Sequence, residues 1–78
     1  MRGPRRVAFT DHAAERAARY ALPAVKVADI VLEEHPHRQG NPGAADWRVR
    51  RGRLVVLYDW PDGDDETTAR VVTVWRAE

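Results

Sequence analysis

The sequence contains no cysteine and no long hydrophobic run. Without cysteine, a chain of 78 residues forms no disulfide bond and no thiolate metal site, so packing or a partner must stabilise its small core. Charged residues interrupt the apolar stretches well before the roughly 18 to 20 residues that a membrane-spanning helix needs. These absences fit a reducing compartment and exclude a helical membrane span.

Several other signatures are missing as well. The first six residues, MRGPRR, are basic like the start of a secretion signal, but VAFTDHAAER follows where an apolar segment would have to lie. A glycine-rich phosphate loop, a serine nucleophile elbow and a cysteine nucleophile are absent. We therefore expect a cytoplasmic protein with no membrane partner and no cofactor, and metal-independent nuclease chemistry if it is an enzyme.

The charges are segregated along the chain, although the formal net charge is only +1. Four arginines lie within residues 48–53, and five carboxylates follow within residues 59–66. A basic patch of this kind attracts polyanions such as nucleic acids. The alternative is that the two groups are a solvated pair of strand ends and a solvated turn, and the sequence leaves both interpretations open.

The residue pattern predicts an α+β domain with an N-terminal strand, a two-helix hairpin and then an antiparallel three-stranded meander packed on the helices. RRVAFT has the short apolar and β-branched character of a strand, and Thr10 or Asp11 can cap the helix that follows. Apolar residues then repeat at helical spacing until Pro36. We expect one domain over residues 1–78, with its core at about residues 7–76.

After a loop expected at residues 37–45, apolar and polar residues alternate, as in strands. Two such strands flank Arg51 and Gly52, which suits a tight hairpin with glycine in the left-handed conformation. In that register Arg50 faces Arg53, and an anion between them would relieve the repulsion of their like charges.

Alternation sorts the hairpin side chains onto two faces of the sheet. The face expected to lie under the helices carries Trp47, Val49, Leu54, Val56 and Tyr58. The opposite, less covered face carries Arg48, Arg50, Arg53, Val55 and Leu57. The arginines of the basic block are therefore predicted to share the open face.

The stretch TDHAAERAARY, residues 10–20, predicts an amphipathic helix. His12, Arg16 and Arg19 fall within an arc of about 60° on its surface, while its alanines line a neighbouring arc that can be buried. An imidazole beside two guanidiniums can hold a phosphate or take part in proton transfer, and it can equally be a solvated helix face.

The predicted order of elements, in under eighty residues, resembles the fold of the RelE and ParE type toxins. The stretches FTDHAAER, WRVRRGRLVVLYDW and VVTVW resemble more closely a bacterial family of domains of unknown function, numbered 4258, which is grouped with that fold. The resemblance covers roughly residues 7–76.

The first helix and the last strand carry the family motifs. His12 and Arg16 match a His-Ala-x-x-Arg run that opens the first helix in the family. The Arg-Gly-Ile that usually follows is replaced by Tyr-Ala-Leu at residues 20–22, so a family arginine is missing, and Arg19 is not its match. The final Thr-Val-Tyr becomes Thr-Val-Trp, and Trp75 lacks the phenolic hydroxyl that a catalytic tyrosine would supply.

The resemblance implies a toxin-type endoribonuclease that acts on RNA or on the ribosome. In this chemistry a 2′-hydroxyl attacks the adjacent phosphate, which requires a group for proton transfer and cations that stabilise the developing charge. We assign His12 and Arg16 to catalysis. The residues assigned to RNA or anion binding are Arg19, Arg48, Arg50, Arg53 and Trp75.

Two non-enzymatic interpretations stay open. On the same scaffold, the arginines of residues 48–53 can dock an acidic peptide, such as the tail of an antitoxin-like protein, and a purely structural or oligomer-forming role is the third alternative. The aromatic residues are expected to be mostly core anchors. The HPH tripeptide at residues 35–37 has no suitably spaced third ligand, so no metal site is predicted.

Overall fold

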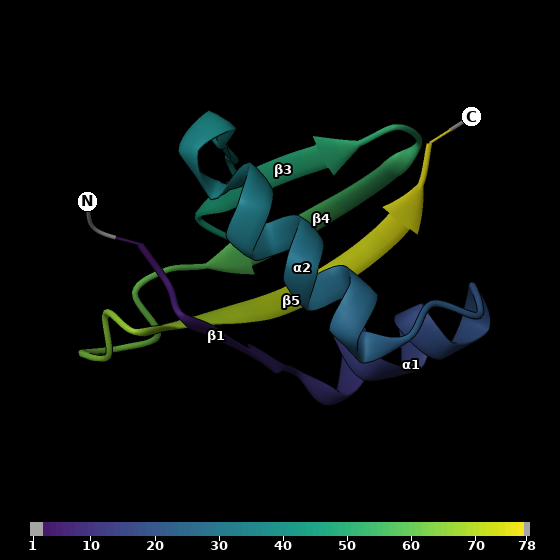
Figure 1. The fold of residues 1–78 in the computed structure, drawn as a ribbon, viewed down its shortest axis with the longest axis horizontal. Coiled ribbons are helices and arrows are strands. Elements are labelled where there is room, and N and C mark those ends of the chain that lie inside the picture. The colour runs from purple at the N-terminus through teal and green to yellow at the C-terminus, as the bar shows by residue number, and fades with distance from the viewer. Residues whose placement is uncertain (1–2, 78) are drawn as a thin grey trace.

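The computed structural model describes residues 3–77 and confirms the α+β class. Two helices pack on a five-stranded mixed sheet with the strand order β1-β5-β4-β3-β2. The elements are β1 (Arg6–Phe9), α1 (Asp11–Arg19), α2 (Ala24–Glu34), the 3-10 turn η1 (His35–His37), β2 (Gln39–Gly40), β3 (Trp47–Arg51), β4 (Leu54–Asp59) and β5 (Thr68–Arg76). Figure 1 shows α2 crossing one face of the sheet, with α1 beside β5.

The sheet has more strands than the expected three-stranded meander because two further segments join it. β1 pairs in parallel with the first half of β5, with Arg6 opposite Thr68, and this pairing makes the sheet mixed. β2 lies within the segment predicted to be a loop, and it pairs with β3 in antiparallel fashion. A strand of two residues and a single 3-10 turn have no periodicity that a sequence pattern can reveal.

The β3–β4 hairpin turns one residue later than predicted. Arg50 pairs with Val55 rather than with Arg53, so Gly52 and Arg53 form the two-residue turn. Gly52 has φ 59°, which suits the first central position of a tight hairpin turn. The predicted opposition of Arg50 and Arg53 is therefore wrong, and so is the inference that an anion would relieve it. Apart from Arg53, which lies in the turn, every side chain of the hairpin still points to the predicted face of the sheet. The reason is that the pairing moves by one residue on both strands, which keeps residues of the same face opposite each other.

The main core lies between the helices and one face of the sheet. α1 contributes only alanines to it, which lets this helix approach β5 closely, whereas α2 contributes larger aliphatic side chains. The buried residues are Ala13, Ala17, Val27, Ile30, Val31, Val49, Val56, Tyr58, Ala69, Val71 and Val74. Packing of these faces positions α1 along the half of β5 that β1 leaves unpaired.

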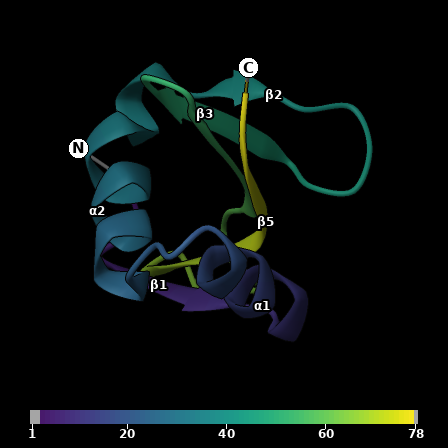
Figure 2. The same cartoon turned by 90° about the vertical axis from the view of Figure 1, so that its right-hand side faces the viewer.

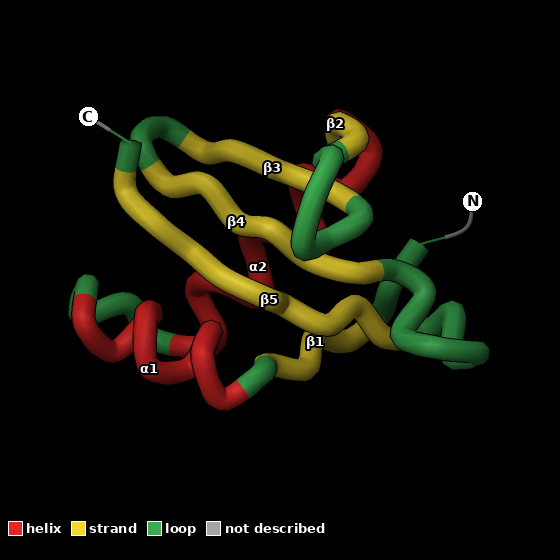
Figure 3. Tube along the Cα trace, turned by 180° about the vertical axis from the view of Figure 1, so that it is seen from behind, coloured by secondary structure: helices red, strands yellow, loops and turns green. Residues whose placement is uncertain are grey.

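The opposite face of the sheet is only partly covered. There a small cluster of Ala45, Val55 and Leu57 is buried, with Val72, Trp75 and Ala77 packed against it. Ala45 belongs to the loop at residues 41–46, which lies on the side of the sheet away from α2 (Figure 2). Seen from behind, β3, β4 and β5 lie in front of α2, and no helix covers their middle (Figure 3).

Thr10 caps the start of α1, as one of the two predicted alternatives. Its hydroxyl oxygen accepts a hydrogen bond from the backbone N–H of Ala13 at 3.0 Å and donates one to the carbonyl of Val72 at 3.2 Å. The cap therefore fixes both the first turn of the helix and its position against β5. Within residues 3–77, no helix has the length and apolar character needed to cross a membrane.

The end of α1 adopts a Schellman motif. The N–H of Leu22 donates to the carbonyl of Ala17 at 2.9 Å, and the N–H of Ala21 donates to that of Ala18 at 3.0 Å. Ala21 has φ 55°, the left-handed conformation that glycine usually supplies at this position. The motif reverses the chain directly into α2, so the link between the helices is short.

Candidate nucleic-acid interface

The less covered face of the sheet holds a hollow of about 420 Å³. Arg50 of β3, Val55 of β4 and Trp75 of β5 form one row across this face, because Arg50 pairs with Val55 and Val55 pairs with Trp75. Arg48 lies on the same face of β3, and all four residues line the hollow. We refer to this surface as the arginine hollow.

The two guanidiniums of the arginine hollow have neutral partners. Nη2 of Arg48 donates to the side-chain oxygen of Gln39 at 2.6 Å, and Nε of Arg50 donates to the carbonyl of Gly52 at 2.8 Å. Neither arginine forms an ion pair with a carboxylate in the described part of the chain. Both side chains are exposed, so their positive charges are free to bind an anion.

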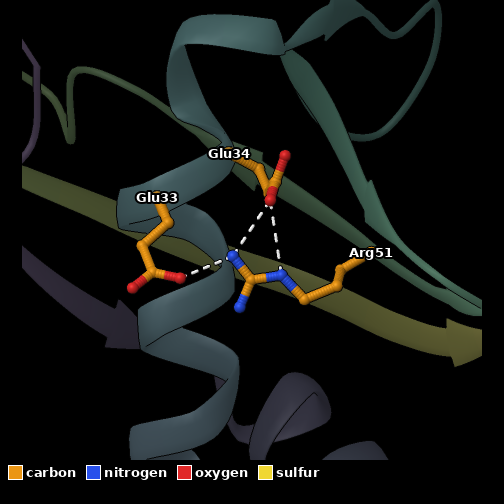
Figure 4. A network of polar contacts seen from close by, with 3 residues as sticks. All are labelled: Glu33, Glu34 and Arg51. Atoms are coloured by element: carbon orange, nitrogen blue, oxygen red, sulfur yellow. Dashed lines mark hydrogen bonds and ion pairs between the residues drawn. The ribbon is translucent and has the colours of Figure 1, made fainter.

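Arg51 belongs to the same basic block but lies on the other face. Its guanidinium binds the carboxylates of Glu33 and Glu34 at the end of α2, with an Nη2–Oε2 distance of 2.9 Å to Glu34 (Figure 4). Hydrogen bonds from Arg51 to these two carboxylates raise the pKa of its guanidinium. The four arginines of the block are therefore divided among a free pair, Arg48 and Arg50, the neutralised Arg51, and Arg53 in the hairpin turn.

His12 lies at the rim of the same face. Its Nε2 atom is 3.2 Å from the hydroxyl oxygen of Thr73, within hydrogen-bond distance. Thr73 pairs with Leu57, which pairs with Arg48, so the row that starts at His12 ends at the arginine hollow. Two strand spacings separate Thr73 from Arg48, about 10 Å between their backbones.

Arg16 and Arg19 share a helix face with His12 but contact different partners. The guanidinium carbon of Arg16 lies 6.0 Å from the centroid of the Tyr20 ring. Arg19 forms an ion pair with Glu15 at 3.0 Å, one turn earlier on the exposed side of α1. Neither guanidinium lines the arginine hollow.

Arg53 lies in the hairpin turn and lines a second hollow, together with Tyr20, Arg76 and Ala77. The structure therefore gathers Arg48, Arg50 and Trp75 around one hollow, places His12 beside Thr73 at the edge of the same sheet face, and places Arg53 elsewhere.

The HPH tripeptide is divided between the interior and the surface. His35 is 4% exposed, and its Nδ1 atom lies 2.7 Å from the hydroxyl oxygen of Tyr58, whereas His37 is exposed and lines the arginine hollow. Burial, and then the charge of Arg38, lower the pKa of His35. No group of three or more His, Cys, Asp or Glu side chains in residues 3–77 is arranged to hold a metal ion.

Thr73 and His37 are the site residues that sequence reasoning missed. Thr73 stands in the family motif, but its contact with His12 joins residues 61 positions apart, which no local pattern reveals. His37 follows a proline, and the direction of its ring depends on the unpredicted 3-10 turn.

The hollow is lined by two guanidiniums that have no carboxylate partner, by the indole of Trp75 and by the carboxylate of Glu34, which Arg51 neutralises. The imidazole of His12 lies at the edge of the same sheet face. These groups can bind phosphates, stack on a base and transfer a proton. No protein-family model, no curated protein and no solved structure matches this chain.

Proposed function

We propose that this protein is an RNA-binding domain of RelE-like fold that holds a single strand in the arginine hollow. The observation that carries the proposal is the row of Arg50, Val55 and Trp75 across an open sheet face, with Arg48 beside it. Guanidiniums bind phosphate oxygens through paired hydrogen bonds, and an indole provides a stacking surface for a base. Such a combination binds single-stranded nucleic acid with little dependence on sequence.

Two structural features support membership of the family numbered 4258. His12 and Thr73 match separate motifs of that family, and their side chains lie 3.2 Å apart. Ala21 stands where the family has glycine, and its φ of 55° is a conformation that glycine favours. The strand, helical hairpin and meander are accordingly interpreted as the RelE-like arrangement.

The proposal includes metal-independent cleavage of the bound strand. The 2′-oxygen attacks the adjacent phosphorus and loses its proton to the imidazole of His12, while the 5′-oxygen leaves and takes a proton from water. Arg48 and Arg50 bind phosphates farther along the strand and hold it in place for cleavage, since Arg48 lies two strand spacings from the Thr73 that His12 contacts. For Arg16, one helical turn from His12, the catalytic role stays a prediction from the family motif.

A non-catalytic interaction module for an acidic partner is the second candidate function. The free charges of Arg48 and Arg50 attract carboxylates as well as phosphates. Along β3, the pairing with β2 covers only Trp47 and Arg48, so the rest of this edge is open to a partner strand. An antitoxin-like acidic peptide would use both features.

Binding of a fluorescein-labelled octauridylate, followed by fluorescence anisotropy, tests the proposed function. We expect Arg48→Gln to lower the affinity about tenfold, as the removal of one charge-assisted hydrogen bond implies. Trp75→Leu should also lower it, because the stacking surface is removed. Lys26→Gln is the control for loss of one positive charge, since Lys26 is exposed on α2 and lines neither this hollow nor the one beside Arg53.

The outcomes separate the candidates. Equal decreases in affinity for Arg48→Gln and Lys26→Gln would show that affinity follows net charge and not this hollow, which contradicts the proposal. An acidic peptide that binds through Arg48 and Arg50, with no binding of octauridylate, would establish the interaction module instead.

A further inference from the structure

A second group of arginines surrounds Tyr20, where α1 ends near the end of β5. The guanidinium carbon of Arg16 lies 6.0 Å from the centroid of the Tyr20 ring, and that of Arg76 lies 5.9 Å from it. Arg53 lines a hollow of about 570 Å³ with Tyr20 and Arg76. These arginines come from α1, β5 and the β3–β4 turn, and we refer to them with Tyr20 as the Tyr20 cluster.

The Tyr20 cluster carries positive charge that the described residues do not neutralise. Arg16, Arg53 and Arg76 form no ion pair within residues 3–77, whereas Arg19, Arg51 and Arg70 each do. The Nε atom of Arg16 is buried and has no hydrogen-bond partner there. The guanidinium carbons of Arg16 and Arg76 lie within about 6 Å of the same ring centroid, so the two charges are at most about 12 Å apart. An anion bound between them would be attracted to both.

The cluster is also preorganised to bind an anion. Contact with the face of an aromatic ring holds a guanidinium in place, which lowers the entropy cost when it binds a ligand. The backbone N–H of Ala77 donates to the carbonyl of Arg53 at 2.6 Å and thereby ties the end of β5 to the hairpin turn. Arg53 and Arg76 are therefore kept together although they are distant in the sequence.

The Tyr20 cluster adjoins the arginine hollow at the end of β5. Ala77 lines both hollows. Trp75 lines the first hollow and Arg76, the next residue, lines the second, because neighbouring side chains of a strand point to opposite faces. A strand whose base stacks on Trp75 can therefore continue over the end of the sheet to Tyr20.

We propose that the Tyr20 cluster is a second phosphate subsite for the same RNA strand, beyond the three nucleotides that the arginine hollow holds. This inference rests on the proposed function, since it extends the strand held in the arginine hollow. It defines the ligand as a single strand long enough to reach both subsites, rather than a mononucleotide. Arg53 and Arg76, which line the hollow, each contact phosphate oxygens and make no contact that depends on the base.

Binding of two oligouridylates tests the second subsite. Fluorescein-labelled trimer and octamer are titrated with the full chain at several KCl concentrations, with anisotropy as the readout. We expect Arg53→Gln and Arg76→Gln each to lower octamer affinity about tenfold, with trimer affinity unchanged. Each substitution should also reduce the salt slope of octamer binding by about 0.7, the value for one neutralised phosphate on a single strand. Arg48→Gln should weaken the binding of both oligonucleotides.

Lys26→Gln is the charge-matched control, because Lys26 is exposed on α2 and lines neither hollow. It should leave the binding of both oligonucleotides unchanged. Far-ultraviolet circular dichroism and the urea midpoint of each variant report whether it folds.

The outcomes distinguish this inference from the proposed function. Octamer affinity that falls in Arg48→Gln but not in Arg53→Gln or Arg76→Gln would overturn the second subsite and leave the arginine hollow intact. If neither oligonucleotide bound the unmodified chain, both proposals would be wrong. Inorganic phosphate that shifts the Tyr20 resonances, with an octamer that binds no better than the trimer, would identify a free-phosphate site and overturn the shared strand.

Discussion

The Nδ1 atom of His35 lies 2.7 Å from the hydroxyl oxygen of Tyr58, and the two side chains are buried together in the core. The ring of Trp60 packs edge-on against His35, with 4.6 Å between the ring centroids. The Nε2 atom of His35 is buried with no hydrogen-bond partner among residues 3–77. A charge on this imidazole would therefore lie in an apolar site that solvates it poorly.

This burial predicts that the protein loses stability in mild acid. The pKa of His35 is lowered from 6.5 in the folded state by burial and by Arg38, so the unfolded chain binds a proton more readily. Stability is complete above about pH 6.5 and is lost as the pH falls from there towards the lowered pKa. The urea midpoint, followed by tryptophan fluorescence, should fall between about pH 7 and pH 5.

His35→Gln should flatten this pH dependence, while His37→Gln should leave it in place because His37 is exposed. Tyr58→Phe keeps the burial of His35 and should retain the acid sensitivity. A pH dependence equal in His35→Gln and the unmodified chain would assign the effect to other groups.

The left-handed conformation of Ala21 predicts a stabilising substitution. A residue with a Cβ atom at φ 55° is strained, by about 1–2 kcal/mol for a non-glycine residue in this region. Ala21→Gly should therefore raise the free energy of unfolding by about 0.5–1 kcal/mol, since the greater flexibility of glycine in the unfolded chain offsets part of the gain. Urea titration measures the change.

The matched control is Ala18→Gly, in the last turn of the same helix with an exposed side chain. It should lower stability by about 0.5–1 kcal/mol, because glycine is a poor helix former. Destabilisation in both variants would contradict the role given to the Schellman motif.

We expect Thr10 both to stabilise α1 and to hold His12, two residues later, in its place beside β5. Thr10→Ala removes the cap on Ala13 and the bond to Val72, and it should lower the free energy of unfolding by about 1–2 kcal/mol. Thr10→Ser retains a hydroxyl and should retain most of the stability. Nuclear magnetic resonance should show the His12 and Thr73 signals shifting in Thr10→Ala and staying close to their original positions in Thr10→Ser.

Cleavage of RNA is expected to depend on His12 without a comparable effect on binding. His12→Gln should abolish cleavage of octauridylate, or of ribosome-bound RNA, because no other group at this rim is assigned to take the proton of the 2′-hydroxyl. Its affinity for the oligonucleotide should stay within about twofold, since His12 does not line the arginine hollow.

Growth of cells during induced expression gives a second readout of cleavage, with Arg48→Gln as the binding-deficient comparison. Purified protein that binds RNA but leaves both substrates uncut would retain the RNA-binding function and overturn the endoribonuclease assignment.

The alternation of residues determined much of the candidate site before any tertiary contact was known. Strand side chains alternate with a period of two, so Arg48 and Arg50 had to share a face opposite Val49. This held although the turn came one residue later than predicted, because a shift of one residue on both strands keeps the parity of every pair. The start of α1 was equally local, since Thr10 caps a turn only three residues long.

Only the tertiary structure decided which of the basic residues are free. Arg51 is neutralised because α2 docks with Glu33 and Glu34 beside β3, and His12 meets Thr73 because β1 pairs in parallel with β5 and delivers α1 to its edge. The Tyr20 cluster likewise requires the ends of α1, β5 and the hairpin to converge. Local periodicity specifies each element and its faces, but the contacts between elements far apart in the chain depend on how their apolar surfaces pack together.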